Sequence, residues 1–191
     1  MSFIENLQST LNLHETKTVA EWEARPAAVL VPLYYYQDEW HLLFTRRTDH
    51  LEEHKGQVAF PGGKMDKADA SPEAAALREA EEEIGLRREH VRTLGQLDEL
   101  LTVTQWRITP VVGVFSYPYE FKINYEECAA VFGVPLRWLR DPAHLEIRQR
   151  QPPVAVGRPV EVYYYREYEG HVIWGATARM VQMLLNLISE K

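Results

Sequence analysis

The stretch 56–86 constrains the fold of this chain more than any other, because its second half carries the start and stop signals of one helix. Ser71 is a suitable N-cap, Pro72 fits the first helical position, and Gly85 fits the position just after the last turn. These signals predict a helix of roughly fourteen residues. We expect the rest of the chain to position that helix.

The predicted helix has two different faces. At about 100° per residue, apolar residues form a stripe on one side, while Glu79, Glu82 and Glu83 gather on the other. Like charges at these spacings oppose helix formation by about 0.2–0.5 kcal/mol per pair, so the acidic face needs either solvent or a cation. Magnesium or manganese suits such an all-oxygen cluster. A solvated acidic face is the alternative.

Glycines precede the helix. Residues 57–60 are predicted to form a short strand, and residues 60–63 the turn that follows it. Because glycine has no side chain, this backbone can approach the acidic face and present carbonyl and N–H groups to a metal or a phosphate. The neighbouring glycines therefore favour a functional acidic face over a solvated one.

This region resembles the Nudix box, the signature of the Nudix hydrolases. The matching positions are Gly63, Arg78, Glu79, Glu82, Glu83, Gly85 and Leu86. One extra residue lies between Gly63 and Arg78, so Asp69 best fills the first acidic position, and Ala80 stands where a bulkier aliphatic residue is common. The resemblance implies an α/β fold, namely the Nudix α/β/α sandwich with a mixed central sheet flanked by helices.

The resemblance also implies roles for individual residues. It implies a magnesium or manganese site whose ligands are Glu79, Glu82, Glu83 and the Gly63 carbonyl. Arg78 is expected to orient the glutamates by pairing with an acid such as Asp69. Such a metal polarises a pyrophosphate and acidifies an attacking water, so the family activity is metal-dependent hydrolysis.

Glu127 is the expected proton acceptor, since glutamates that coordinate a metal are poor general bases. It precedes an apolar run, 128–136, that resembles a family segment in which a glutamate commonly faces the metals. Glu126 is the second choice, and a solvated loop glutamate is the alternative. The apolar flanks of Cys128 predict a buried, unreactive thiol.

Residues 42–63 resemble the signature of the coenzyme A pyrophosphatase branch, and the resemblance to this family extends over most of residues 26–188. It implies a small-molecule substrate, coenzyme A or its acyl derivatives, cleaved to 3′,5′-ADP and 4′-phosphopantetheine. Glu52 stands where the family usually has an arginine. Two alternatives stay open: a Nudix hydrolase of another nucleoside diphosphate derivative such as ADP-ribose, and a nucleotide-binding module without catalysis.

A polar, basic segment follows the predicted strand 40–45. We expect its cationic side chains to bind the substrate phosphates, with Arg47 contributing to recognition of a 3′-phosphate, although a solvated loop is the alternative. The expected phosphate-binding residues of this segment are Arg46, Arg47, His54 and Lys55.

Size and composition exclude other classes. A length of 191 residues with 46% hydrophobic content fits one compact domain, 26–191, preceded by an N-terminal helical extension, 1–25, that starts with a capping box of Ser2 and Glu5. The net charge of −7 argues against a nucleic-acid partner. No apolar run approaches the ~20 residues that span a bilayer, and no signal peptide is recognisable, so we expect no membrane partner and a cytoplasmic location.

Further elements follow from local patterns. Strands are expected at 27–36, 40–45, 91–101, 107–115 and 160–165, the first two forming a hairpin. A helix is expected at 177–188. Arginines and prolines in 148–159 predict an extended flap or hairpin that contacts substrate or a second subunit, which leaves a homodimer open.

Overall fold

The computed structural model describes residues 2–20, 23–49, 55–151 and 159–189. In chain order the elements are α1 (Phe3–Leu13), β1 (Arg25–Tyr36), β2 (Glu39–Arg47), β3 (Val58–Ala59), β4 (Gly62–Lys64), α2 (Pro72–Ile84), η1 (Arg88–His90), β5 (Val91–Gln96), β6 (Leu100–Leu101), β7 (Trp106–Phe115), β8 (Cys128–Pro135), α3 (Leu136–Arg140), η2 (Pro142–His144), β9 (Leu145–Arg150), β10 (Val160–Tyr165) and α4 (Gly175–Ser189). The expected hairpin, both long helices and the strands expected at 27–36, 40–45, 107–115 and 160–165 are therefore present.

The central sheet is organised around β1. The strand order is β3-β2-β1-β7-β5, with β4 also paired to β1, β8 to β2 and β6 to β7. β1 runs antiparallel to β2 and β4 but parallel to β7, so the sheet is mixed. Residues 27–34 of β1 are all buried, because this strand has packed layers on both of its faces.

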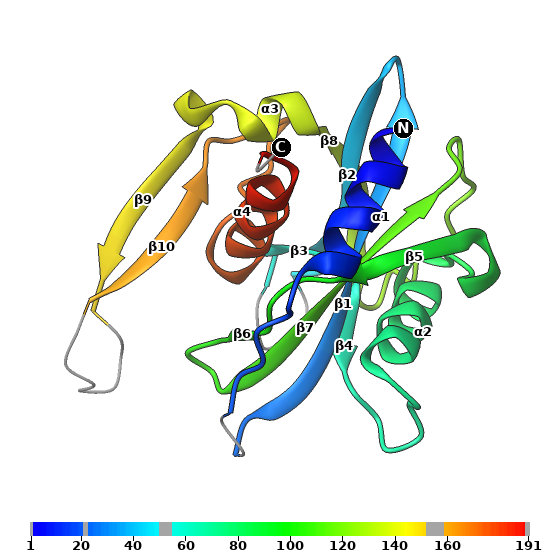
Figure 1. The fold of residues 1–191 in the computed structure, drawn as a ribbon, viewed down its shortest axis with the longest axis horizontal. Helices are drawn as coiled ribbons and strands as arrows, with labels where there is room; N and C mark the ends of the chain where they lie inside the picture. Colours follow the sequence, from blue (N-terminus) through cyan, green and yellow to red (C-terminus); the bar gives the residue numbers. More distant parts are fainter. Residues whose placement is uncertain (1, 21–22, 50–54, 152–158, 190–191) are drawn as a thin grey trace.

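Helices cover both faces of this sheet (Figure 1). On one face, α2 packs its Ala76 and Ile84 in a cluster with Ala28 and Leu30 of β1. On the other face, α1 and α4 contribute Leu7 and Leu184 to a cluster with Val29 and Val31. Alternate side chains of one strand thus serve two separate cores. The result is the expected α/β/α sandwich with a mixed central sheet.

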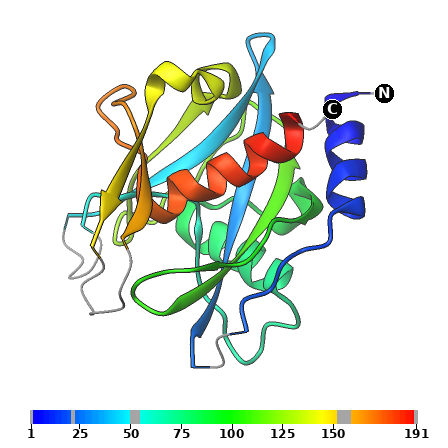
Figure 2. The same cartoon turned by 60° about the vertical axis from the view of Figure 1, so that its left-hand side comes forward.

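The N-terminal helix α1 is packed against the rest of the chain, beside one end of α4 (Figure 2). Its capping box is formed as predicted, with Glu5 N–H donating to the Ser2 hydroxyl and Ser2 N–H donating to the Glu5 carboxylate. Leu11 packs so closely on Gly95 that a Cβ there would lie 2.8 Å from the Leu11 Cβ. The side chain of His14 then pairs with Asp98 at 2.7 Å.

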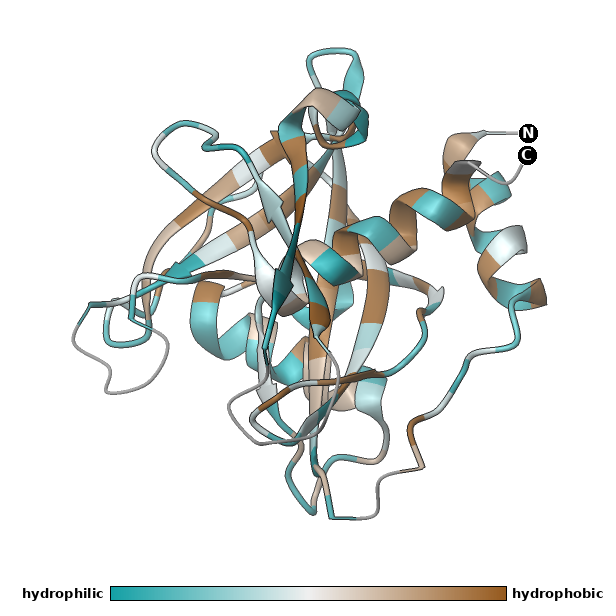
Figure 3. Cartoon of the chain, turned by 90° about the vertical axis from the view of Figure 1, so that its left-hand side faces the viewer, coloured by the Kyte–Doolittle hydropathy of each residue, from teal (hydrophilic) through white to brown (hydrophobic). Residues whose placement is uncertain are grey.

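A second, two-stranded sheet lies beside α4. β9 and β10 pair antiparallel, with Val160 opposite Arg150, so the predicted flap is a hairpin whose residues 152–158 lie outside the described residues. Figure 3 shows brown and teal residues alternating along α4, as its amphipathic pattern predicts. The Thr177 hydroxyl donates to the Val58 carbonyl at 3.1 Å and joins the start of α4 to β3. Within the described residues, no helix is long and apolar enough to cross a bilayer.

Two expectations about local structure were wrong. Gly62–Lys64 is not a turn but strand β4, paired with β1. Gly62 makes this pairing possible, because its φ is 154° and a Cβ there would lie 2.5 Å from the Ala28 carbonyl oxygen. Residues 91–101 are not one strand, because 97–99 leave the sheet: Asp98 accepts a hydrogen bond from Lys17 N–H at 2.9 Å and thereby holds the N-terminal segment.

The packing of α1 predicts that it unfolds together with the sheet. Leu7→Ala is expected to lower the free energy of unfolding by about 2–4 kcal/mol, because the side chain is only 3% exposed and its removal leaves a cavity. Leu13→Ala on the same helix is the control, since Leu13 is 81% exposed and its loss should change stability by less than about 0.5 kcal/mol. Urea unfolding of both variants measures this. Equal effects would make α1 an independent appendage.

Candidate functional site

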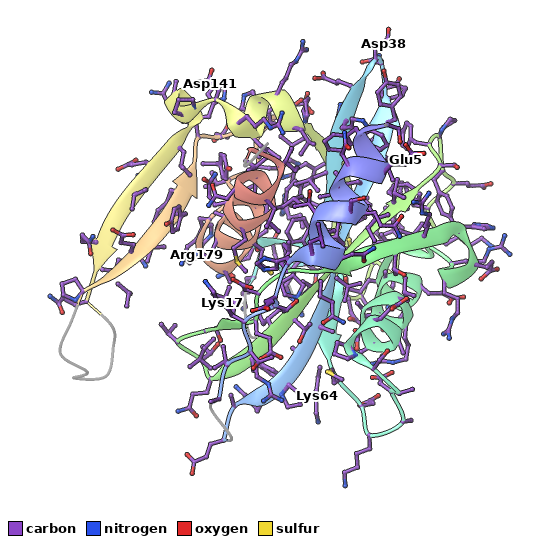
Figure 4. All side chains as sticks on the ribbon, in the orientation of Figure 1. Glu5, Lys17, Asp38, Lys64, Asp141 and Arg179 are labelled. Carbon is purple, nitrogen blue, oxygen red and sulfur yellow. The ribbon has the colours of Figure 1, made fainter. Side chains whose placement is uncertain are left out.

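Helix α2 has the limits that the sequence predicted. The Ser71 hydroxyl accepts a hydrogen bond from Ala74 N–H at 3.1 Å, Pro72 occupies the first turn, and Gly85 closes the helix in the left-handed conformation with φ 67°. The face of α2 that carries Glu79 contacts β4. Figure 4 shows Lys64, the last residue of β4, at the opposite end of the molecule from Asp38 at the tip of the β1–β2 hairpin.

Arg78 holds the acidic residues in place. Its Nε and Nη2 donate to the two carboxylate oxygens of Asp69 at 3.0 and 2.9 Å, the bidentate geometry that an arginine fork favours. Its Nη1 donates to Glu79 Oε1 at 2.8 Å. The hydrogen bonds from Arg78 lower the pKa of Asp69, so this acid is held as a carboxylate. The pairing of Arg78 with Asp69 that the sequence predicted is present.

Glu79 lies directly against Gly63. A Cβ at Gly63 would lie 2.6 Å from Glu79 Oε2, so no other residue leaves room for the carboxylate at this place. Burial raises the pKa of Glu79, while the hydrogen bond from Arg78 works in the opposite direction. The predicted close approach of the glycine backbone to the acidic face is therefore present, but it is made by a strand.

The other two box glutamates differ in their surroundings. Glu83 is turned into the protein and is only 5% exposed, whereas the side chain of Glu82 is 57% exposed and lies 3.6 Å from Arg78. Burial raises the pKa of Glu83 to about 8, although the charge of Arg47 and a hydrogen bond from Gly62 N–H oppose that rise. A uniformly solvated acidic face is thus excluded, because one of its members faces inward.

The two arginines at the end of β2 project from opposite faces of the sheet. Arg47 faces α2, with its Nη1 4.0 Å from Glu83 Oε1. Arg46 stands opposite Val58, whose side chain belongs to the core under α4, and its Nη2 donates to Asp49 at 2.8 Å. The structure therefore brings Arg47 to the glutamates and leaves Arg46 on the other side.

A stacked ring pair lies on the side of Arg46. His171 stacks on Phe132 with ring centroids 3.9 Å apart, and Phe132 stands opposite Phe44 on the same face. Burial and the positive charge of Arg46 lower the pKa of His171. Of the remaining predicted phosphate ligands, Lys55 is exposed and His54 lies outside the described residues.

Glu127 lies in the turn that is bonded to α2, where Asn124 N–H donates to the Glu83 carbonyl at 2.9 Å. Its charge contributes to raising the pKa of Glu79 and of Glu83, and its side chain is half-buried. Glu126 is exposed, so of the two acids the structure brings Glu127 to the site. The thiol of Cys128 is buried, and burial raises its pKa to about 11, which makes it unreactive as expected.

The acidic residues suit a divalent cation by their chemistry and by the room at Gly63. They offer carboxylate oxygens, and the glycine leaves the Glu79 carboxylate open where a side chain would cover it. Among the described residues, the side chains do not converge into a cluster of three metal-binding groups. The Glu79 carboxylate is instead paired with Arg78. Carboxyl groups outnumber guanidinium groups here, so a further positive charge is favourable.

Two residues of the site were not singled out from the sequence. Asp66 lies 3.9 Å from Arg78 Nη2 and adds to its acidic surroundings. Asn124 Nδ2 donates to Glu127 Oε1 at 3.4 Å. Asn124 Oδ1 also accepts from Glu126 N–H at 3.2 Å, two residues on, which is the turn that an asparagine side chain favours, and that signal could have been used.

Comparisons with known proteins identify the family. The NUDIX domain model matches residues 24–144. The uncharacterized Nudix hydrolase NudL of Escherichia coli K12 is 38% identical over 169 residues, which cover 87% of this chain and 84% of NudL. A MutT/nudix family protein from Enterococcus faecalis has a TM-score of 0.57 at 16% identity, and the match covers 100% of this chain and 71% of that protein. The Nudix hydrolase RenU from M. smegmatis has a TM-score of 0.52 at 23% identity, and the match covers 67% of this chain and 84% of RenU. The chain thus belongs to the Nudix hydrolase family of enzymes.

Proposed function

We propose that this Nudix hydrolase cleaves the pyrophosphate of coenzyme A, and of its acyl derivatives, to 3′,5′-ADP and 4′-phosphopantetheine. The substrate is supported by the resemblance of residues 42–63 to the coenzyme A pyrophosphatase branch. The chemistry rests on one observation, the Glu79 carboxylate held between Arg78 and the bare backbone of Gly63. ADP-ribose is the principal rival substrate, because it presents the same pyrophosphate to the same residues.

The box glutamates would hold the cofactor, magnesium or manganese. The proposed ligands are Glu79, Glu82, Glu83 and the Gly63 carbonyl. When bound, the divalent ion supplies Lewis acidity, which polarises the pyrophosphate and acidifies water. Arg78 restricts Glu79 to one orientation, and this preorganisation lowers the cost of forming the site.

The two faces of β2 suggest how the substrate lies. Arg47 stands next to Glu83 and is placed to neutralise the pyrophosphate, whose charge grows as the bond breaks. Arg46 points to the other face, beside His171, and would meet a group away from the scissile bond. We therefore assign the 3′-phosphate of coenzyme A to Arg46 in place of Arg47, which the sequence had favoured but which lies beside Glu83. An arginine recognises a phosphate monoester through charge-assisted hydrogen bonds.

Glu127 is the proposed general base. Water attacks one phosphorus of the pyrophosphate, its proton passes to the Glu127 carboxylate, and the bond from phosphorus to the bridging oxygen breaks. Glu127 suits this step because it lies beside the box glutamates without being one of the proposed ligands. The exposed Glu126 is less well placed.

Hydrolysis of a substrate panel tests the substrate and the two arginines together. Coenzyme A should have a higher kcat/KM than dephospho-coenzyme A and ADP-ribose, each measured with MgCl2 and with MnCl2. Arg46→Ala should reduce the preference for coenzyme A over dephospho-coenzyme A by about tenfold or more, since a charge-assisted hydrogen bond is lost only when its phosphate is present. Arg47→Ala is the matched control and should slow both substrates equally. Faster cleavage of ADP-ribose by the wild type would reject coenzyme A as the substrate.

Adjacent glycines provide a test of the metal-site geometry. Gly63→Ala should retain its fold but lose about a hundredfold in turnover, because its Cβ would displace the flexible end of Glu79. Gly62→Ala should instead lose about 2–4 kcal/mol of stability, since its Cβ would meet the backbone of Ala28 and Val29 at 2.5 Å. Thermal melts and magnesium-dependent turnover separate the two effects. Full turnover of Gly63→Ala would argue against Glu79 as a ligand.

The general base is tested by Glu127→Gln, which keeps the shape of the side chain but cannot accept the proton. Turnover should fall by about 10²–10⁴, while KM and the magnesium concentration for half-maximal rate change little. Glu126→Gln, the neighbouring exposed carboxylate, should retain turnover. A loss of magnesium affinity in Glu127→Gln would reassign Glu127 as a metal ligand, and unchanged turnover would remove it from the site.

A further inference from the structure

The segment 119–124 closes the C-terminal end of the catalytic helix α2. The last carbonyl groups of a helix have no partner within it, and here the chain that follows β7 supplies donors. Lys122 N–H donates to the Ile84 carbonyl at 3.0 Å, and the Tyr119 hydroxyl donates to the Gly85 carbonyl at 3.1 Å. A Cβ at Gly85 would lie 2.9 Å from the Lys122 backbone nitrogen, so the two segments are in close contact.

Asn124 is the point where this segment also meets Glu127. Its backbone N–H donates to the Glu83 carbonyl at 2.9 Å, and its own carbonyl accepts from Glu127 N–H at 3.1 Å and from Cys128 N–H at 2.9 Å. Its side-chain Oδ1 accepts from Glu126 N–H at 3.2 Å, and its Nδ2 donates to Glu127 Oε1 at 3.4 Å. One residue is thus bonded to both α2 and the turn that begins β8.

We infer that Asn124 is a positioning residue that fixes the carboxylate of Glu127 relative to the glutamates of α2. The inference rests on the proposed function, because it takes Glu127 as the general base. The backbone of Asn124 fixes the distance between the turn and the helix, and its amide N–H points Glu127 Oε1 in one direction. A base that must receive a proton from one water gains from such restraint, since small misplacements cost large factors in rate.

The amide is needed because one polar atom of the Asn124 side chain accepts a hydrogen bond and the other donates one. Oδ1 must accept from a backbone N–H, while Nδ2 must donate to a carboxylate. Aspartate has the same shape and can still accept at Oδ1, but its second oxygen would face Glu127 as a like charge. The pair of variants Asn124→Ala and Asn124→Asp therefore separates the support of the turn from the orientation of Glu127.

The first experiment measures kcat, KM and melting temperature with coenzyme A and ADP-ribose in MgCl2. Asn124→Asp should melt within about 2 °C of the wild type, because it keeps the bond to Glu126 N–H, yet kcat should fall by about ten- to a hundredfold at nearly constant KM. Asn124→Ala should lower both kcat and the melting temperature. Tyr125→Ser is the control in the same turn, since Tyr125 is 71% exposed, and it should behave as the wild type.

The second experiment combines Asn124→Asp with Glu127→Gln. If Asn124 acts through Glu127, Asn124→Asp should slow the wild type but not the Glu127→Gln enzyme any further, because that enzyme has no base to misplace. The same fold-loss in both backgrounds, or full turnover of Asn124→Asp, would overturn the positioning role while leaving Glu127 as the base. Full turnover of Glu127→Gln alone would instead refute the base assignment, and the role of Asn124 with it.

Discussion

The site depends on how closely the backbone of β4 fits between β1 and α2. Two consecutive glycines allow it, and each faces a different neighbour. Gly62 lies against the backbone of Ala28 and Val29, while Gly63 lies against the carboxylate of Glu79. Because side chains alternate along a strand, one glycine serves the sheet and the other serves the site. The fold and the chemistry are therefore joined at two adjacent positions of the chain.

Electrostatics explains why arginines and a backbone N–H surround the glutamates of α2. Burying Glu83 away from water is unfavourable, and the charge of Arg47 and the N–H of Gly62 offset part of the cost. Arg78 does the same for Glu79, and it is itself held by both oxygens of Asp69. Carboxyl groups still outnumber the arginines around α2, which is the condition under which a divalent cation binds well.

The end of β2 places two consecutive arginines on different faces of one sheet. Arg47 belongs to the face of α2, and Arg46 to the face of α4, although they are neighbours in the chain. His171, from the turn before α4, joins Arg46 from a distant part of the sequence. Cationic side chains therefore lie on both sides of the sheet at this end.

The sequence by itself determined the helix α2, its caps, the pairing of Arg78 with Asp69 and the outline of the α/β/α sandwich, since these follow from local patterns and a family signature. Tertiary structure decided that Glu83 faces inward, that Gly62–Lys64 is a strand, and that Arg46 and Arg47 contact different neighbours on opposite faces of the sheet. It also joined Asn124 to both Glu83 and Glu127. The Asn124–Glu127 bond joins residues three apart in sequence and has a local signal. The burial of Glu83, the pairing of β4 with β1 and the bond from Asn124 N–H to the Glu83 carbonyl arise between segments far apart in the chain, so periodicity and spacing do not encode them.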